Sequence, residues 1–189
     1  IQQFISEVEW GNLDYLIIDL PPGTSDEPLT VSQSLPNIDG MVIVTTPQAV
    51  ALLDSRKSIT FAESLKVPVL GVVENMSGYT INGVTAANVS VEIAGPGGKT
   101  IKSTSDEDGN FSVTLDIFKK GGGKSTAEDF GVPFLGALPF DPGFVRGGDD
   151  GVHKIVSDPE GASSIAFSEI VKAVLAQISD KPSSSLEII

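Results

Sequence analysis

The sequence contains no cysteine and only one histidine, His153. The absence of cysteine excludes disulfides, thiolate zinc sites, cysteine nucleophiles and any iron–sulfur cluster held by this chain's own thiolates. A single histidine cannot form a histidine-rich metal site by itself, and we interpret His153 as a surface residue rather than a catalytic base. These absences exclude the common functions that depend on thiols or on several imidazoles.

Positive charge and long apolar runs are also scarce. The 189 residues include 12 Lys and Arg against 25 Asp and Glu, which gives a formal net charge of −13. This balance argues against binding nucleic acid or anionic lipid through positive surface charge. No apolar run approaches the roughly 18 to 20 residues of a membrane span. We expect a soluble, cytoplasmic protein that binds neither nucleic acid nor membranes. Because the chain begins with Ile1 rather than Met, we also expect it to lack its natural start.

Apolar residues make up 40% of the chain, which is enough for a packed core. Four short, continuous apolar runs predict strands that are covered on both faces: Tyr15–Leu20, Met41–Val44, Val69–Val73 and Phe134–Leu138. Helices are expected over Ala49–Lys66 and Glu160–Ile178, where apolar residues recur near helical spacing. This alternation is typical of an α/β fold with a mostly parallel sheet flanked by helices, whose ligand edge is formed by the carboxyl ends of the strands.

Residues 80–115 interrupt this pattern. Apolar and polar residues alternate from Val89 to Ile93 and again from Phe111 to Ile117, and glycine-rich or acidic turn signals lie between them. We therefore expect an inserted antiparallel β element, which we interpret as a projecting structural flap rather than a binding surface. The predicted α/β domain has two parts, residues 1–79 and residues 116–180. The inserted element, residues 80–115, lies between them, and residues 181–189 form a tail.

The segment from Leu16 to Thr24 (LIIDLPPGT) carries the strongest chemical signal. An apolar strand that ends in Asp19 places a carboxylate at the ligand edge, where it could hold a magnesium ion directly or through water. Two prolines stiffen the following turn, and Gly23 offers a backbone N–H with no side chain to obstruct a phosphate. The alternative is a strand-end aspartate that caps the next helix, followed by prolines that only end the strand.

Several motifs, in consistent order, resemble the Mrp/ApbC family of P-loop ATPases, part of the MinD/ParA-like group with deviant Walker motifs. The resemblance covers most of the chain and rests on these segments: Asp19–Thr30, Val44–Val50, Leu53–Lys57, Val67–Gly78, Asp116–Phe118, Gly121–Gly123, Gly131–Gly136 and Leu138–Asp141. It implies a P-loop NTPase-like domain of which this chain forms the carboxyl-terminal part. The sheet is then incomplete at the N-terminus, because its first strand and helix are missing.

The resemblance also implies a function. Members of the family bind and hydrolyse ATP with Mg2+ as dimers, and they carry or insert iron–sulfur clusters. By position, Asp19 corresponds to the residue near magnesium and Gly23 to the backbone amide near the γ-phosphate. Asn75 corresponds to the residue whose side-chain amide reads adenine, which suits a group that donates and accepts at once. Backbone groups of Pro139, Phe140 and Asp141 complete the adenine pocket. The implied partners are a second copy and iron–sulfur acceptor or scaffold proteins.

Two departures bear on activity. The family carries a glycine-rich Walker A loop with a signature lysine near the start of the domain, and the printed sequence has no such segment before Asp19. The family also places a Cys-x-x-Cys pair shortly after the Asn-Met-Ser-Gly turn, where this chain enters the β insertion instead. Residues 103–113 of that insertion faintly resemble carboxypeptidase-regulatory-like β-sandwich repeats, which imply no activity.

Lys120–Thr126 (KGGGKST) looks like a Walker A loop but departs from the required spacing, since Phe118 stands where the first glycine belongs. We interpret it as a structural loop that the family also has, with a substitute phosphate site around Lys124 as the alternative.

Two alternatives to an iron–sulfur carrier ATPase remain. The first is a truncated or chimeric relative that serves as a non-enzymatic scaffold or interaction module. The second is a partitioning ATPase of the MinD/ParA kind, which the absence of a basic amphipathic tail disfavours.

Overall fold

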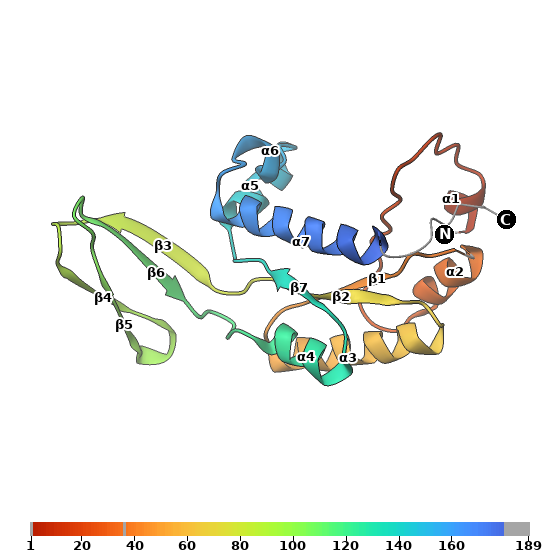
Figure 1. The fold of residues 1–189 in the computed structure, drawn as a ribbon, viewed down its shortest axis with the longest axis horizontal. Coiled ribbons are helices and arrows are strands. Elements are labelled where there is room, and N and C mark those ends of the chain that lie inside the picture. Colours follow the sequence, from red (N-terminus) through yellow and green to blue (C-terminus); the bar gives the residue numbers. More distant parts are fainter. Residues whose placement is uncertain (1, 36, 180–189) are drawn as a thin grey trace.

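A three-stranded parallel sheet forms the centre of the computed structural model, which describes residues 2–35 and 37–179 (Figure 1). Its strands are β1 (Met41–Thr45), β2 (Val69–Glu74) and β7 (Phe134–Ala137), in the order β1-β2-β7. Helices α3 (Ala49–Ser64) and α4 (Gly122–Phe130) cover one face, and α7 (Ala162–Ser179) covers the other. The expected α/β fold with a parallel sheet between helices is confirmed.

The two faces of the sheet are packed by separate groups of apolar side chains. On the α3 and α4 face, the fully buried Ile59 and Val72 pack with Ile43 and Ala127. On the α7 face, the buried group consists of Val73, Leu135 and Ile170. Because side chains alternate along a strand, neighbouring residues of β2 serve opposite faces, which is why this strand is apolar throughout.

Four further helices surround this centre. Helices α5 (Pro142–Asp150) and α6 (Lys154–Ser157) lie between β7 and α7 in the chain. Helices α1 (Gln2–Ser6) and α2 (Asp26–Ser34) pack on each other through a satellite cluster made by Ile5, Val31 and Leu35. In Figure 1 this pair lies at the right-hand end of the sheet.

A β arm, defined as residues 79–115, projects from the opposite end of the sheet (Figure 1). Strand β3 (Tyr79–Val84) pairs antiparallel with β6 (Asn110–Leu115), and β4 (Ser90–Ala94) pairs antiparallel with β5 (Thr100–Thr104). A short 3-10 turn, η1 (Pro96–Gly98), joins β4 to β5. The antiparallel strands expected within the insertion are therefore present, whereas its role and the domain boundaries drawn around it remain predictions.

The strand predicted over Tyr15–Leu20 is wrong. This segment contains no regular secondary structure, and the side chain of Ile17 is 90% exposed. The physical reason is that a strand needs a neighbour for its backbone groups. Among the described residues no strand pairs with 15–20, and β1, whose outer edge is open, pairs with β2 alone.

The other elements agree with expectation within a few residues. Three predicted strands and both long helices are present, with α3 ending at Ser64 and α7 running from Ala162 to Ser179. By length and mean hydropathy of 1.2, α7 is the one described helix that could cross a membrane, with 17% of it buried. That is weak evidence for a span, because helices that cover a sheet pass the same test. The tail predicted at 181–189 lies outside the described residues.

Candidate functional site

Backbone hydrogen bonds gather the carboxyl ends of the three strands into one edge. The Asn75 N–H donates to the Thr45 carbonyl at 2.7 Å, which ties the end of β2 to that of β1. The Leu138 N–H donates to the Glu74 carbonyl at 2.7 Å, which ties the end of β7 to β2. The loops that follow these strands therefore begin side by side.

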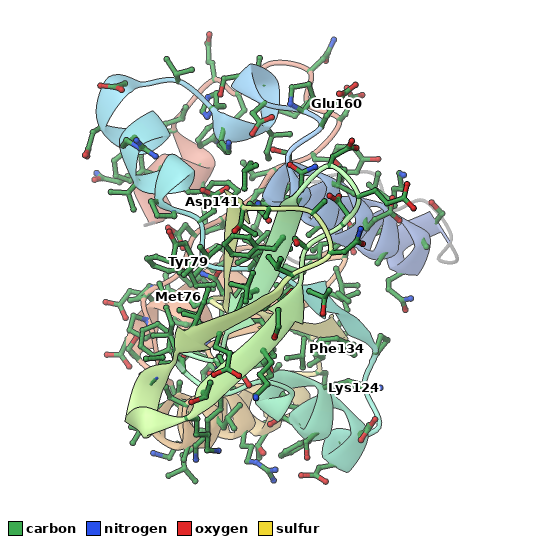
Figure 2. The ribbon with its side chains drawn as sticks, turned by 90° about the vertical axis from the view of Figure 1, so that its left-hand side faces the viewer. Met76, Tyr79, Lys124, Phe134, Asp141 and Glu160 are labelled. Atoms are coloured by element: carbon green, nitrogen blue, oxygen red, sulfur yellow. The ribbon has the colours of Figure 1, made fainter. Side chains whose placement is uncertain are left out.

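The loop after β7 then runs along the turn after β2. The Ser77 N–H donates to the Leu138 carbonyl at 2.9 Å, and the Phe140 N–H donates to the Gly78 carbonyl at 2.8 Å. Figure 2 labels Met76, Tyr79 and Asp141 along this edge. The structure thus brings the turn that carries Asn75 next to Pro139, Phe140 and Asp141.

Asn75 is half-buried at the start of a tight turn. Its Oδ1 accepts a 2.9 Å hydrogen bond from the backbone N–H of Met76, whose φ of +56° is the left-handed conformation. The carboxamide nitrogen is therefore the group through which Asn75 can donate to a ligand. The ring of Phe140 meets that of Tyr79 edge-on, with centroids 5.8 Å apart, which adds a side-chain contact between the two loops.

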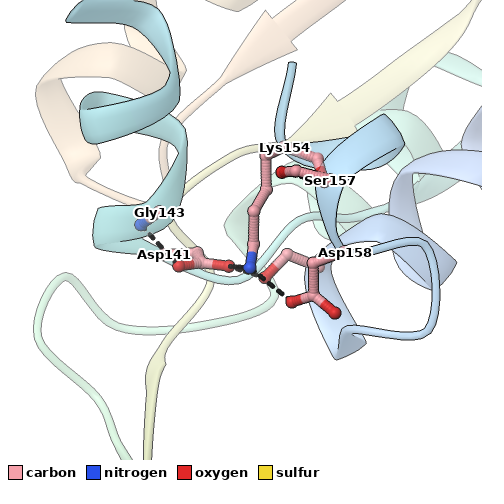
Figure 3. Close-up of polar contacts among 6 residues, drawn as sticks. Asp141, Gly143, Lys154, Ser157 and Asp158 are labelled. Carbon is pink, nitrogen blue, oxygen red and sulfur yellow. Dashed lines mark hydrogen bonds and ion pairs between the residues drawn. The ribbon is translucent and has the colours of Figure 1, made fainter. Parts of the chain in front are cut away.

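Asp141 holds two helices together rather than standing free (Figure 3). Its carboxylate caps α5 by accepting a 2.7 Å hydrogen bond from the Gly143 N–H, and it accepts another of 2.7 Å from the Ser163 hydroxyl at the start of α7. These hydrogen bonds, with that of Ser163 first, and the charge of Lys154 at 4.0 Å hold the pKa of Asp141 below its ordinary value. Lys154 also pairs with Asp158. The carboxylate of Asp141 therefore serves the packing of α5 and α7, and the contact proposed for Asp141 in the adenine pocket is a backbone one.

The glycine-rich loop before α4 already has an anionic partner. The buried carboxylate of Glu74 accepts hydrogen bonds from the N–H groups of Gly121, at 3.0 Å, and Gly123, at 2.7 Å. Lys124 lies on the exposed side of α4, 4.0 Å from Glu128. Since Glu74 occupies the helix N-terminus where a phosphate would bind, the geometry supports the structural interpretation of residues 120–126.

Sequence reasoning missed Glu74. The signal was present, because an acidic residue directly follows the apolar run Val69–Val73 in a strand that is buried on both faces. What the sequence does not reveal is where its hydrogen-bond donors come from, since they lie 47 and 49 residues further along.

Asp19 and Gly23 belong to a different part of the molecule. Asp19 is exposed, while its neighbours Ile18 and Leu20 pack on the satellite cluster of α1 and α2. Gly23 has a φ of +93°, and a Cβ built there would meet nothing within 4 Å. Within residues 2–35 and 37–179, no group of three or more His, Asp or Glu side chains could hold a metal ion. A magnesium ion at Asp19 would therefore need phosphate and water as its other ligands.

Solved structures define the class to which this fold belongs. The nucleotide-binding protein of Archaeoglobus fulgidus in complex with ADP superposes with a TM-score of 0.55 at 32% identity, over 88% of this chain and 55% of that one. The MinD cell division protein of Aquifex aeolicus gives a TM-score of 0.54 at 17% identity, over 94% and 57%, and this likeness shows the fold alone. The fold is that of a MinD-like P-loop NTPase.

The sequence then places the chain in a family. The profile described as "ParA: NUBPL iron-transfer P-loop NTPase" matches residues 1–103 and 107–175. The iron–sulfur cluster carrier protein of Methanocaldococcus jannaschii is 38% identical over 181 residues, 96% of this chain and 52% of its own length. The cytosolic Fe-S cluster assembly factor NUBP2 homolog of Trichoplax adhaerens is 42% identical over 177 residues, 93% and 57%.

The chain belongs to this family of iron–sulfur cluster carrier and assembly P-loop NTPases. The resemblance drawn from the motifs of the sequence is confirmed. The chain spans about half the length of the curated relatives that it matches.

Proposed function

We propose that this chain supplies the adenine-binding edge of a nucleotide site in an iron–sulfur cluster carrier. The observation that carries the proposal is the hydrogen-bonded edge that sets the Asn75 turn against Pro139, Phe140 and Asp141. An adenine ring needs both donors and acceptors at its edge, and this turn offers the Asn75 carboxamide together with backbone groups of the facing loop. The ADP complex of the Archaeoglobus relative supports a nucleotide as the ligand.

The described residues fit the base of a nucleotide better than its phosphates. The one glycine-rich helix N-terminus of the expected kind, at α4, is filled by Glu74. Asp19 and Gly23 are the proposed contacts of Mg2+ and the γ-phosphate, and they lie in the segment whose Ile18 and Leu20 pack on the cluster of α1 and α2. We therefore assign base recognition to this chain and derive no hydrolysis step from it.

The proposed cargo is an iron–sulfur cluster, handled by a homodimer in the cytoplasm and passed to acceptor or scaffold proteins. The family and its cytosolic relatives support this assignment. Because the printed sequence has no cysteine, its residues cannot supply thiolates for such a cluster, in either copy of the proposed homodimer. Chemical reconstitution of the chain with iron and sulfide should give no stable cluster absorbance, and a stable cluster on the chain alone would contradict this.

Calorimetric titration with adenosine, ADP and ATP, with and without Mg2+, tests the nucleotide proposal. If this chain contributes base contacts alone, adenosine and ADP should bind with similar affinity, and Asn75→Ala should weaken both. Asp19→Ala should leave adenosine and ADP binding unchanged, and a loss of ATP binding in this variant only when Mg2+ is present would instead show the proposed Mg2+ contact. Asp149→Ala, on the exposed side of α5, serves as the matched control.

A much tighter affinity for ADP than for adenosine would instead reveal a phosphate site on this chain. No binding by a folded chain would favour the second candidate, a non-enzymatic scaffold or interaction module. The specific observation behind that candidate is the projecting β arm, which follows the Asn-Met-Ser-Gly turn, after which the resemblance implies a cysteine pair.

A further inference from the structure

Glu74 is a buried acid at the junction of the sheet and the β arm. Its side chain is 1% exposed, and both of its carboxylate oxygens are engaged. Oε1 accepts hydrogen bonds from the Ser77 hydroxyl at 2.6 Å and from the Gly121 N–H at 3.0 Å, and Oε2 accepts one from the Gly123 N–H at 2.7 Å. A buried carboxylate with three donors restricts the movement of the segments that carry those donors. Breaking one of the hydrogen bonds would leave a buried polar group unpaired.

The donors come from both roots of the arm, which we define as the short segments that precede Tyr79 and follow Leu115. Ser77 lies two residues before Tyr79, where the arm begins, and Gly121 lies six residues after Leu115, where it ends. The two roots also touch directly, since a Cβ at Gly78 would lie 2.6 Å from the Lys120 side chain. Beyond these roots the arm's strands pack on one another, and Figure 1 shows the arm extending away from the sheet.

The same residue adjoins the proposed adenine edge. Asn75 follows Glu74 in the chain, and the Glu74 carbonyl accepts the Leu138 N–H at the start of the facing loop. We propose that Glu74 is a positioning residue that fixes the orientation of the β arm relative to the sheet and couples it to the Asn75 turn. The coupling to the turn matters for nucleotide only if the proposed function holds, whereas the positioning of the arm does not depend on it.

The absence of native cysteine makes a direct test possible, because engineered cysteines take spin labels without background. Labels at Lys57→Cys on α3 and Thr100→Cys on β5, both exposed positions, report the distance between body and arm by pulsed electron paramagnetic resonance. We expect one narrow distance peak in the parent chain and its loss in Glu74→Gln, whose amide nitrogen meets a backbone donor where a carboxylate oxygen accepted. Glu128→Gln, on the exposed side of α4, should leave the peak unchanged.

Ser77→Ala removes one of the three hydrogen bonds and keeps the test decisive if Glu74→Gln does not fold. It should broaden the peak while the thermal transition stays cooperative. An unchanged peak in a folded Glu74→Gln or Ser77→Ala chain would overturn the proposal, since other contacts, such as that of Tyr79 with Phe140, would then set the arm. ADP titration of the same variants is read separately. If the parent chain binds no ADP, that result counts against the proposed function only. If a variant has a broadened peak but the same ADP affinity as the parent chain, the proposed coupling between the arm and the Asn75 turn is overturned.

Discussion

The carboxylate of Asp141 accepts a 2.7 Å hydrogen bond from the hydroxyl of Ser163, which joins the start of α5 to the first turn of α7. Asp141 also caps α5 through the Gly143 N–H. One side chain thus closes the loop that follows β7 and lies beside the proposed adenine edge.

Replacing Asp141 should lower stability in a way that depends on pH. The folded state lowers the pKa of Asp141, so the carboxylate stabilises the fold above the unfolded pKa of about 3.9, and this contribution is lost as pH falls through the folded value. Asp141→Asn should cost about 1 kcal/mol at pH 7. In urea unfolding curves, the difference in unfolding free energy between Asp141→Asn and the parent chain should shrink below about pH 4.

Asp141→Ala separates capping from charge. Asparagine can still cap α5, but alanine cannot, so the alanine variant should lose about a further 1 kcal/mol at neutral pH. Equal stabilities for the two variants would show that the cap contributes nothing.

The open edge of β1 should make the isolated chain self-associate, because unpaired backbone groups and apolar side chains there can pair with another edge. Val44 on this strand is 61% exposed. Val44→Lys should shift sedimentation profiles toward monomer, whereas Val156→Lys, at a 77% exposed position on α6, should not. A parent chain that stays monomeric at high concentration, with an ordinary mesophilic melting transition, would contradict the expected instability of this edge.

Gly71 and Gly148 should respond to alanine in opposite directions. A Cβ at Gly71 would lie 2.5 Å from the Pro133 carbonyl, in a backbone with φ of +149°, so Gly71→Ala should cost about 3 kcal/mol or more. Gly148 lies within α5 with open space around it, and Gly148→Ala should stabilise the chain by about 0.5–1 kcal/mol. Urea unfolding of both variants checks the pair.

Ser105 should control the order of the β arm without affecting the sheet. Its buried hydroxyl accepts from the Val89 N–H at 2.9 Å and donates to the Ala86 carbonyl at 2.6 Å. Ser105→Ala should cost about 1–2 kcal/mol and speed amide hydrogen exchange in β4 and β5, while exchange in β2 stays slow. Ser90→Ala at an exposed position is the control, and uniform acceleration throughout the chain would contradict a local role.

The elements that could be predicted from the sequence are those whose apolar residues meet a neighbouring strand or helix in the fold. The continuous apolar residues of β1, β2 and β7 predicted a covered parallel sheet, and alternation within 80–115 predicted antiparallel strands. The segment 15–20 is equally apolar, yet it forms no strand, since a strand depends on a neighbour that no local pattern reports.

The candidate site divides in the same way. Asn75 and Pro139–Asp141 were expected on one edge, and backbone hydrogen bonds place them there, although their roles remain proposals. Glu74 could not be assigned from its surroundings in the sequence, because its backbone hydrogen-bond donors are brought from a distant loop by the fold.

The register of the arm bears on whether another segment could replace it. Tyr79 pairs with Leu115, so the first and last residues of the arm lie about 5 Å apart. Removing everything between them would leave two ends that one short turn can rejoin, without altering the order of β1, β2 and β7. The arm is thus replaceable as a unit. A different hairpin or a cysteine-bearing loop could join the chain at Tyr79 and Leu115 and leave the sheet that holds the Asn75 turn unchanged.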